Sequence, residues 1–448
     1  MSRLIPGFLT VAVAIGTYFL LPESCPEAAR RCASVFVVAA GFWAFEVLPV
    51  YVTSLVIVLL LSLSLAKPGG VLEMDRQGYT VFLAPFSSPV LMLFFGGFIL
   101  AEALKKNGAD RYLATKFLKR LSSSQITFLF GVVGCTALLS MWLSNTAATV
   151  IMLGVLHPVI QDVNINSSMR KGLMLSVPFS ANIGGIGTPI GTPPNAMAMG
   201  FLSDFNIYID FTSWMILCVP LMGALLLFLM AVMYFSYLRE NHPLPIRIQS
   251  FVALEREGRE TLIIAGLTIV LWVSSPIHGI PEPLTALLSV GALMVMGLID
   301  RNSIKQINWD VLILMWGGLA LGVGIEISGL GHWVIDSFFD GWQGISSVIL
   351  LASFALLLSL FISNTATAAL IIPIALEAAP EHRTLMGVTI ALMCSTAMVF
   401  PVSTPPNAIA YGTGLIDHRE MIKAGALITF GCYIIVVLGF WWIIPAVM

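Results

Sequence analysis

Two polar runs occur twice in this sequence, each inside a long apolar segment. The first is Ser140-Met-Trp-Leu-Ser-Asn-Thr-Ala147, which is repeated as Ser359-Leu-Phe-Ile-Ser-Asn-Thr-Ala366. The second is Pro189-Ile-Gly-Thr-Pro-Pro-Asn-Ala-Met-Ala198, which matches Pro401–Ala410 at seven of ten positions. Non-helical backbone inside an apolar layer is tolerated only where it is buried in protein or lines a cavity. Paired runs of this kind therefore predict one binding site built by two halves of the chain.

Each run carries residues that begin helices. Serine, threonine and asparagine side chains accept hydrogen bonds from the free N–H groups of a first helical turn, and proline is favoured at the first helical position. We therefore predict four helix N-termini that meet near the middle of the apolar layer. Their free N–H groups and partial positive charge would bind an anion without any lysine or arginine.

The same runs also supply oxygen ligands for a small cation. Hydroxyl, amide and carbonyl oxygens are the groups with which transporters coordinate sodium. The predicted ligands are Ser140, Ser144, Asn145 and Gly191 in the first half, and Ser359, Ser363, Asn364 and Ser403 in the second half. A sodium ion held beside the anion would couple the two binding events.

The composition places the chain in a membrane. Hydrophobic residues make up 58% of the 448 residues and charged residues only 10%, whereas soluble domains carry about 25% charged residues. The net charge of −2 argues against a nucleic acid or another polyanion as partner. The six cysteines have no metal-ligand spacing and are predicted to be small buried hydrophobic residues.

The distribution of basic residues predicts the topology. An arrangement of about eleven transmembrane helices and two re-entrant hairpins, with the N-terminus inside and the C-terminus outside, puts 17 of the 22 Lys and Arg residues on the inner face. The first hairpin, 124–160, then opens to the cytoplasm and the second, 346–379, to the exterior. Residues 105–120 read as a basic amphipathic helix along the inner membrane surface.

The two halves of the chain carry matching runs and hairpins, and the hairpins open to opposite sides of the membrane. This arrangement defines an inverted-topology repeat in an all-α polytopic membrane protein. We expect residues 1–32 to form an N-terminal helix and an outer loop, and 239–260 to form a cytoplasmic linker. The first repeat is predicted to span 33–238, with a broken helix at 172–205. The second is predicted to span 261–448, with a broken helix at 384–415.

At these runs the chain resembles the divalent anion/sodium symporter family, whose hallmark is the paired Ser-Asn-Thr motif. The resemblance covers essentially the whole chain. It implies a homodimer, a scaffold domain, and a mobile transport domain that moves like an elevator, with sodium as the coupling ion. It also implies substrate contacts at Asn145, Thr146, Thr192, Pro193, Asn364, Thr365, Thr404 and Pro405. The first run has glycine at position 191 where the second run has serine, at position 403, so the two cation sites need not be equivalent.

Other functions find less support in the sequence. An intramembrane enzyme needs a nucleophile–base pair or clustered metal ligands in the membrane, and the sequence offers neither. Glu46, Glu102, Glu326 and Glu377 could relay protons, but they occupy no matched positions and are expected to be solvated at span ends. A channel stays open as an alternative, although an inverted repeat favours alternating access.

We therefore predict a secondary active transporter that carries a small dicarboxylate of the succinate, malate and fumarate class inward with sodium. It is expected in the lipid bilayer of a bacterial inner membrane. Sodium-independent dicarboxylate exchange, and transport of sulfate or a tricarboxylate by the same fold, remain the alternatives.

Overall fold

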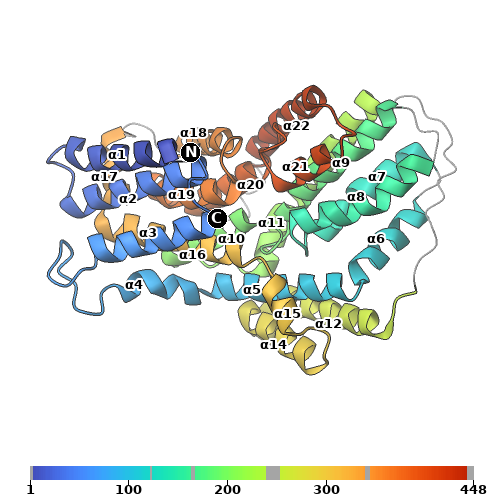
Figure 1. Ribbon diagram of the computed structural model, residues 1–448, viewed down its shortest axis with the longest axis horizontal. Coiled ribbons are helices and arrows are strands. Elements are labelled where there is room, and N and C mark those ends of the chain that lie inside the picture. The colour runs from blue at the N-terminus through green and yellow to red at the C-terminus, as the bar shows by residue number, and fades with distance from the viewer. Residues whose placement is uncertain (1–3, 122–123, 163–166, 239–252, 339–343, 441–448) are drawn as a thin grey trace.

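The computed structural model is built of helices that are joined by turns and loops (Figure 1). The structure describes residues 4–121, 124–162, 167–238, 253–338 and 344–440, and these contain no strand. Most of the predicted linker, residues 239–252, and the end of the predicted second repeat, residues 441–448, lie outside the described residues. All six cysteines are buried, as predicted.

The described residues before the linker form eleven α-helices. They are α1 (Leu4–Leu20), α2 (Glu27–Ala44), α3 (Val50–Ser64), α4 (Thr80–Leu83), α5 (Pro89–Lys106), α6 (Ala109–Arg120), α7 (Gln125–Ser140), α8 (Asn145–Asp162), α9 (Ser167–Gly184), α10 (Pro193–Asp204) and α11 (Phe211–Tyr237). Two 3₁₀ turns, η1 (Ala84–Ser87) and η2 (Gly185–Gly187), lie before α5 and after α9.

Eleven more α-helices lie in the described residues after position 252, and the first of them begins inside the predicted linker. They are α12 (Arg256–Val273), α13 (Ser275–His278), α14 (Glu282–Val295), α15 (Arg301–Gln306), α16 (Trp309–Ser328), α17 (Leu330–Phe338), α18 (Ile345–Ser359), α19 (Asn364–Ala378), α20 (Arg383–Ser395), α21 (Pro405–Gly412) and α22 (His418–Leu438). The 3₁₀ turn η3 (Pro380–His382) precedes α20.

The order of elements from α5 to α11 recurs from α16 to α22. In both series a long helix is followed by a short helix, a helical hairpin, a broken helix and a final long helix. The junctions between the first two elements also match, because Gly108 and Gly329 both have a positive φ, of 68° and 71°. Glycine adopts this left-handed conformation without the steric penalty of a side chain. The inversion of the two halves stays a prediction.

Three described helices are long and apolar enough to cross a membrane: α11, α16 and α22. A fourth such span results if Thr80–Ser87 and Pro89–Lys106, which meet at a bend of 41°, count as one. The hairpin helices α7, α18 and α19 and the Asn145–His157 part of α8 are among the shorter apolar helices of 10–17 residues, and a full crossing takes about 20 residues. Short hairpin helices are compatible with re-entry, but the predicted eleven spans stay a prediction.

The two halves interlock through their short helices. The first-half helix α10 packs against α19 and α20 of the second half, and the second-half helix α21 packs against α8 and α9 of the first. In Figure 1, α1–α3 and α17 lie at one end of the long axis and α6–α9 at the other. Because α10 and α21 cross between the halves, the breaks that precede them meet in the middle of the molecule.

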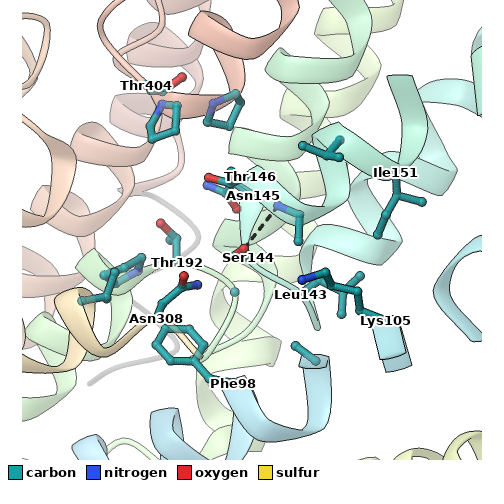
Figure 2. A pocket seen from close by; sticks show the side chains of 18 of the residues that line it. Phe98, Lys105, Leu143, Ser144, Asn145, Thr146, Ile151, Thr192, Asn308 and Thr404 are labelled. Atoms are coloured by element: carbon teal, nitrogen blue, oxygen red, sulfur yellow. Dashed lines mark hydrogen bonds between the residues drawn. The ribbon is translucent and has the colours of Figure 1, made fainter. Parts of the chain in front are cut away.

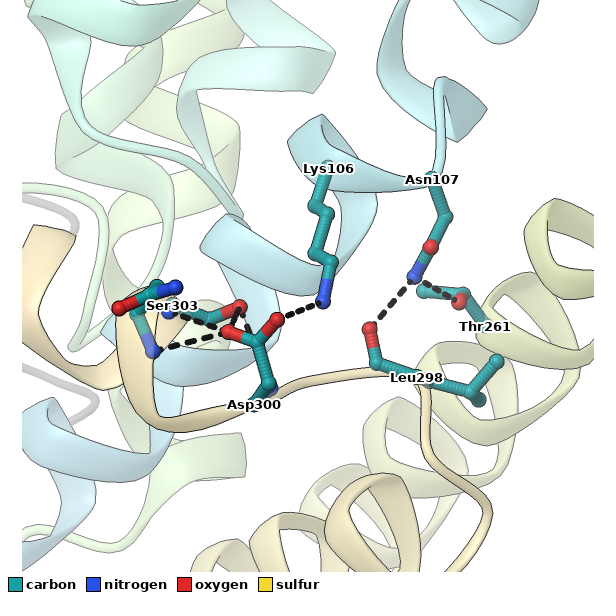
Figure 3. Close-up of polar contacts among 7 residues, drawn as sticks. Lys106, Asn107, Thr261, Leu298, Asp300 and Ser303 are labelled. Carbon is teal, nitrogen blue, oxygen red and sulfur yellow. Dashed lines mark hydrogen bonds and ion pairs between the residues drawn. The ribbon is translucent and has the colours of Figure 1, made fainter.

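The junction of α5 and α6 is tied to the second half (Figure 3). The Lys106 Nζ atom lies 3.0 Å from Asp300 Oδ2, and Asn107 Nδ2 donates to Thr261 Oγ1 at 2.9 Å and to the Leu298 carbonyl at 3.1 Å. Hydrogen bonds from Ser303, with the help of Lys106, lower the pKa of Asp300 to about 2. The carboxylate therefore stays charged at any physiological pH, and this contact ties the end of α5 to the second half.

One sequence interpretation is wrong. We expected Glu377 to be solvated at a span end, but only 6% of it is exposed. Its Oε2 atom lies 3.7 Å from His332 Nε2 and 4.0 Å from Arg383 Nη2. A buried carboxylate needs such partners, and they come from α17 and α20. The sequence alone did not predict that these two helices lie next to α19.

Candidate functional site

The hairpin tips carry the Ser-Asn-Thr runs. In each hairpin the first helix ends at a serine, Ser140 or Ser359, and the second begins five residues later at Asn145 or Asn364. The N–H group of Ala147 donates to Ser144 Oγ at 3.2 Å, and that of Ala366 donates to Ser363 Oγ at 3.3 Å. The serine of each run is thus the residue that caps the returning helix, which confirms the prediction of a helix start at each tip.

The breaks before α10 and α21 are built alike. Thr192 and Thr404 are the N-cap residues and the prolines that follow begin the helices, as predicted. Asn195 Nδ2 donates to the carbonyls of Gly185 and Thr188, at 2.9 and 2.8 Å. In the second half Asn407 Nδ2 donates to the carbonyls of Met398 and Phe400, both at 3.0 Å. These fully buried amides hold the unwound segments in place.

All four helix starts border one cavity of about 910 Å³ (Figure 2). The predicted site residues that line it are Ser144, Asn145, Thr146, Gly191, Thr192, Pro193, Ser363, Asn364, Thr365, Ser403, Thr404 and Pro405. Figure 2 shows Asn145, Thr192 and Thr404 around this space, at the starts of three different helices. These lining residues carry no charge, so an anion there would meet helix N-termini and polar side chains.

Ser140 lies behind the first hairpin tip, in a cluster of oxygen atoms. Its fully buried hydroxyl is 2.7 Å from both Asn145 Oδ1 and the Ala181 carbonyl oxygen. The same amide position of Asn145 lies 3.2 Å from the carbonyl oxygens of Ala181 and Gly191. With nitrogen there, the amide donates to all three oxygen atoms. With oxygen there, four oxygen atoms lie close together, and oxygen atoms are the ligands with which transporters hold sodium.

Glycines allow this close approach. A Cβ atom on Gly185 would lie 2.4 Å from Asn145 Oδ1 and 3.0 Å from the Gly191 carbonyl oxygen. A Cβ atom on Gly191 would lie 2.4 Å from the Gly185 carbonyl oxygen. Only residues without a side chain fit at both positions, because real Cβ atoms essentially never come within 3.0 Å of another heavy atom.

The second half forms a related but different cluster. The fully buried Ser359 hydroxyl lies 2.9 Å from Asn364 Oδ1 and 3.2 Å from the Cys394 carbonyl oxygen. Ser403 stands where the first half has Gly191, and its side chain makes hydrogen bonds that glycine cannot make. Its hydroxyl donates to the Leu360 carbonyl at 3.0 Å and accepts from the Phe400 N–H at 3.1 Å. The two clusters are therefore chemically unequal.

Sequence reasoning missed Asn182. This residue lines the cavity although only 1% of it is exposed. Its Nδ2 atom donates to Thr404 Oγ1 at 3.1 Å, and its Oδ1 atom accepts from Asn145 Nδ2 at 3.5 Å. Asn182 thus bridges the first hairpin and the second broken helix. The signal in the sequence that could have found Asn182 is that it is an uncharged amide inside an apolar stretch, although it lies in neither repeated run.

Charged side chains line the same cavity at its opposite end. They are Glu102, Lys105, Asp110 and Arg111, and Lys105 Nζ lies 3.2 Å from Glu102 Oε2. Burial raises the pKa of the Asp110 carboxyl above its usual range, against the N–H group and charge of Arg111. The cavity therefore runs from the uncharged helix starts to the charged segment around α6.

The comparisons with known proteins agree with this architecture. A family model described as a citrate transporter matches residues 40–398. The sodium-dependent dicarboxylate transporter SdcS of Staphylococcus saprophyticus is 30% identical, over 92% of this chain and 87% of that protein. The protein of the same name from Staphylococcus aureus strain USA300 is 28% identical, over 96% of this chain and 89% of that protein.

Two solved transporters share the fold at low sequence identity. The YdaH transporter of Alcanivorax borkumensis has a TM-score of 0.59 at 14% identity, covering 89% of this chain and 99% of that one. MtrF of Neisseria gonorrhoeae has a TM-score of 0.55 at 12% identity, covering 90% of this chain and 96% of that one. The resemblance inferred from the paired Ser-Asn-Thr runs is confirmed, and the chain belongs to the citrate transporter family.

Proposed function

We propose that this transporter carries a small dicarboxylate, of the succinate, malate and fumarate class, together with sodium. The observation that carries the proposal is the single cavity bordered by four helix N-termini, two from each half of the chain. The similarity to proteins named sodium-dependent dicarboxylate transporters supports it.

The substrate is proposed to lie between the two hairpin tips. One carboxylate would meet Asn145 and Thr146 at the start of α8, and the other Asn364 and Thr365 at the start of α19. Thr192-Pro193 and Thr404-Pro405, which begin α10 and α21, border the same space. Two pairs of N-termini favour an anion with a negative charge at each end.

Sodium is proposed to occupy the oxygen clusters behind the tips. Ser140, Ser144, Asn145 and the Gly191 carbonyl would hold one ion. Ser359, Ser363, Asn364 and the Ser403 carbonyl would hold another. Each ion would lie next to a carboxylate, and the Coulombic attraction between them makes each bind more tightly when the other is present.

Transport is proposed to follow an elevator-type alternating-access cycle in a homodimer. The topology predicted from the loop charges would put the N-terminus and the charged end of the cavity on the cytoplasmic side of a bacterial inner membrane. In this orientation the described cavity faces inward. The mobile part would comprise both hairpins with α9, α10, α20 and α21, and the glycines at the α5–α6 and α16–α17 junctions would let it move.

A tricarboxylate is the second candidate substrate, because the matching family model is described as a citrate transporter. The cavity of about 910 Å³ is large enough for either acid. Competition therefore has to decide between them.

The test is uptake of labelled succinate by the purified protein in liposomes. We expect the initial rate to be high with external sodium and low with choline in its place. Unlabelled malate and fumarate should compete more strongly than citrate or sulfate. Equal uptake in sodium and choline would contradict symport and favour exchange, and stronger competition by citrate would reassign the substrate.

A further inference from the structure

We propose that Asn182 relays sodium occupancy in the first half of the chain to an anion-binding hydroxyl in the second half. The proposal rests on the function proposed above and adds a positioning residue to it. Its basis is a continuous series of polar contacts that runs from Ser140 through Asn145 and Asn182 to Thr404. Among the hydrogen bonds described above, only this series joins the first sodium cluster to the second broken helix.

The Asn145 amide has two orientations of nearly the same shape. In one, Oδ1 points at Ser140 and at the Ala181 and Gly191 carbonyl oxygens, and Nδ2 points at Asn182. Two carbonyl oxygens 3.2 Å from an amide oxygen repel it unless a cation lies among them. In the other, the nitrogen donates to Ser140 Oγ at 2.7 Å and to the two carbonyls at 3.2 Å. Sodium therefore selects the first orientation, and its loss favours the second.

Asn182 must follow this choice. When Asn145 presents Nδ2, Asn182 accepts with Oδ1 and turns its own Nδ2 to Thr404, across contacts of 3.5 and 3.1 Å. When Asn145 presents Oδ1, Asn182 has to donate to it, and its oxygen then faces Thr404. A buried amide that faced its neighbours with the wrong atoms would leave hydrogen-bonding groups unsatisfied.

Thr404 is the end of the relay. In the described geometry its hydroxyl oxygen accepts from Asn182 Nδ2 at 3.1 Å and from the Asn407 N–H at 3.3 Å. Both lone pairs are then used, so the O–H hydrogen is available to a carboxylate in the cavity. In the alternative geometry that hydrogen is donated to Asn182 Oδ1 instead. Sodium behind the first tip thus frees an anion donor across the cavity.

The relay predicts a particular effect of removing Asn182. In Asn182→Ala the Thr404 hydroxyl is free whether or not sodium is bound, so succinate binding with sodium should change by less than about threefold. Succinate binding without sodium should become tighter. The ratio of the two affinities should therefore fall about tenfold, which is the change expected for one charge-assisted hydrogen bond. A merely structural defect would weaken binding under both conditions.

The experiment measures binding of labelled succinate to the purified full-length protein, in saturating sodium and in choline, with sodium-induced thermal stabilisation as a separate readout of ion binding. Ser180→Ala is the matched control, because this buried serine of α9 bonds only the Ser176 and Val177 carbonyls of its own helix. If Asn182→Ala does not fold, Asn182→Cys is measured in its place. Cysteine is chosen because Cys394 occupies the matched position of the second half, at the same distance before its Thr-Pro-Pro-Asn run.

The outcomes separate the two proposals. Wild-type protein that binds no succinate, or binds it equally in both salts, overturns the proposed symport, and the relay falls with it. Sodium-strengthened binding in the wild type with an unchanged affinity ratio in the Asn182 variant overturns the relay alone. A reduced ratio with retained sodium-induced stabilisation supports it.

Discussion

The Gly185→Ala substitution tests whether the oxygen cluster behind the first hairpin tip works as a sodium site. The added Cβ atom would lie 2.4 Å from Asn145 Oδ1, and ordinary contact begins at 3.4 Å. The amide therefore has to move by about 1 Å, whereas metal–ligand distances are held to within about 0.2 Å. Overpacking of this kind typically costs about 1–3 kcal/mol. If that cost is taken from ion binding, the sodium affinity falls roughly 5- to 150-fold.

The assay is the initial rate of labelled succinate uptake by proteoliposomes as a function of external sodium. We expect the half-saturating sodium concentration of Gly185→Ala to rise by that factor. Gly134→Ala is the matched control, because it makes the same change in α7, where an added Cβ atom meets no heavy atom within 4 Å. A Gly185→Ala protein with the sodium dependence of the wild type would refute the placement of sodium beside Asn145.

Three further predictions follow from the same contacts. Asn145→Ala and Asn364→Ala should each nearly abolish succinate uptake without lowering the unfolding temperature greatly, and near-normal uptake by either would remove that residue from the site. Asn407→Ala leaves the Met398 and Phe400 carbonyls without their buried donor, so thermal unfolding should show a free energy of unfolding that is lower by about 1–3 kcal/mol. An unchanged unfolding temperature would contradict the role of Asn407 in holding the unwound segment in place. Burial raises the pKa of Asp110, so its contribution to stability is present below its unfolded pKa and is lost as pH rises through the folded pKa. Asp110→Asn should therefore unfold at a higher temperature than the wild type at pH 8, with the difference shrinking towards pH 4, and a pH-independent difference would argue against this account.

The helix breaks were predictable because their signals are local. The capping roles of Ser363 and Thr404 depend on the N–H group three residues ahead, and proline at the first helical position is a property of the same short segment. The meeting of the four breaks at one cavity followed from their repetition.

Features that depend on distant contacts could not be predicted in this way. Asn182 gains its significance from Thr404, 222 residues away, and lies in neither repeated run. Glu377 is buried because α17 and α20 bring His332 and Arg383 to it. A hydropathy pattern records how apolar a segment is, but it does not record which polar atom of another helix will face it.

The central claim is that one cavity couples an anion to sodium. The most direct test is whether a sodium gradient drives the accumulation of succinate. Proteoliposomes are loaded with labelled succinate at equal concentration on both sides, and a sodium gradient is then imposed from outside. The account predicts that internal succinate rises above the external concentration and falls back when a sodium ionophore dissipates the gradient. Internal succinate that stays at the external concentration throughout would contradict it.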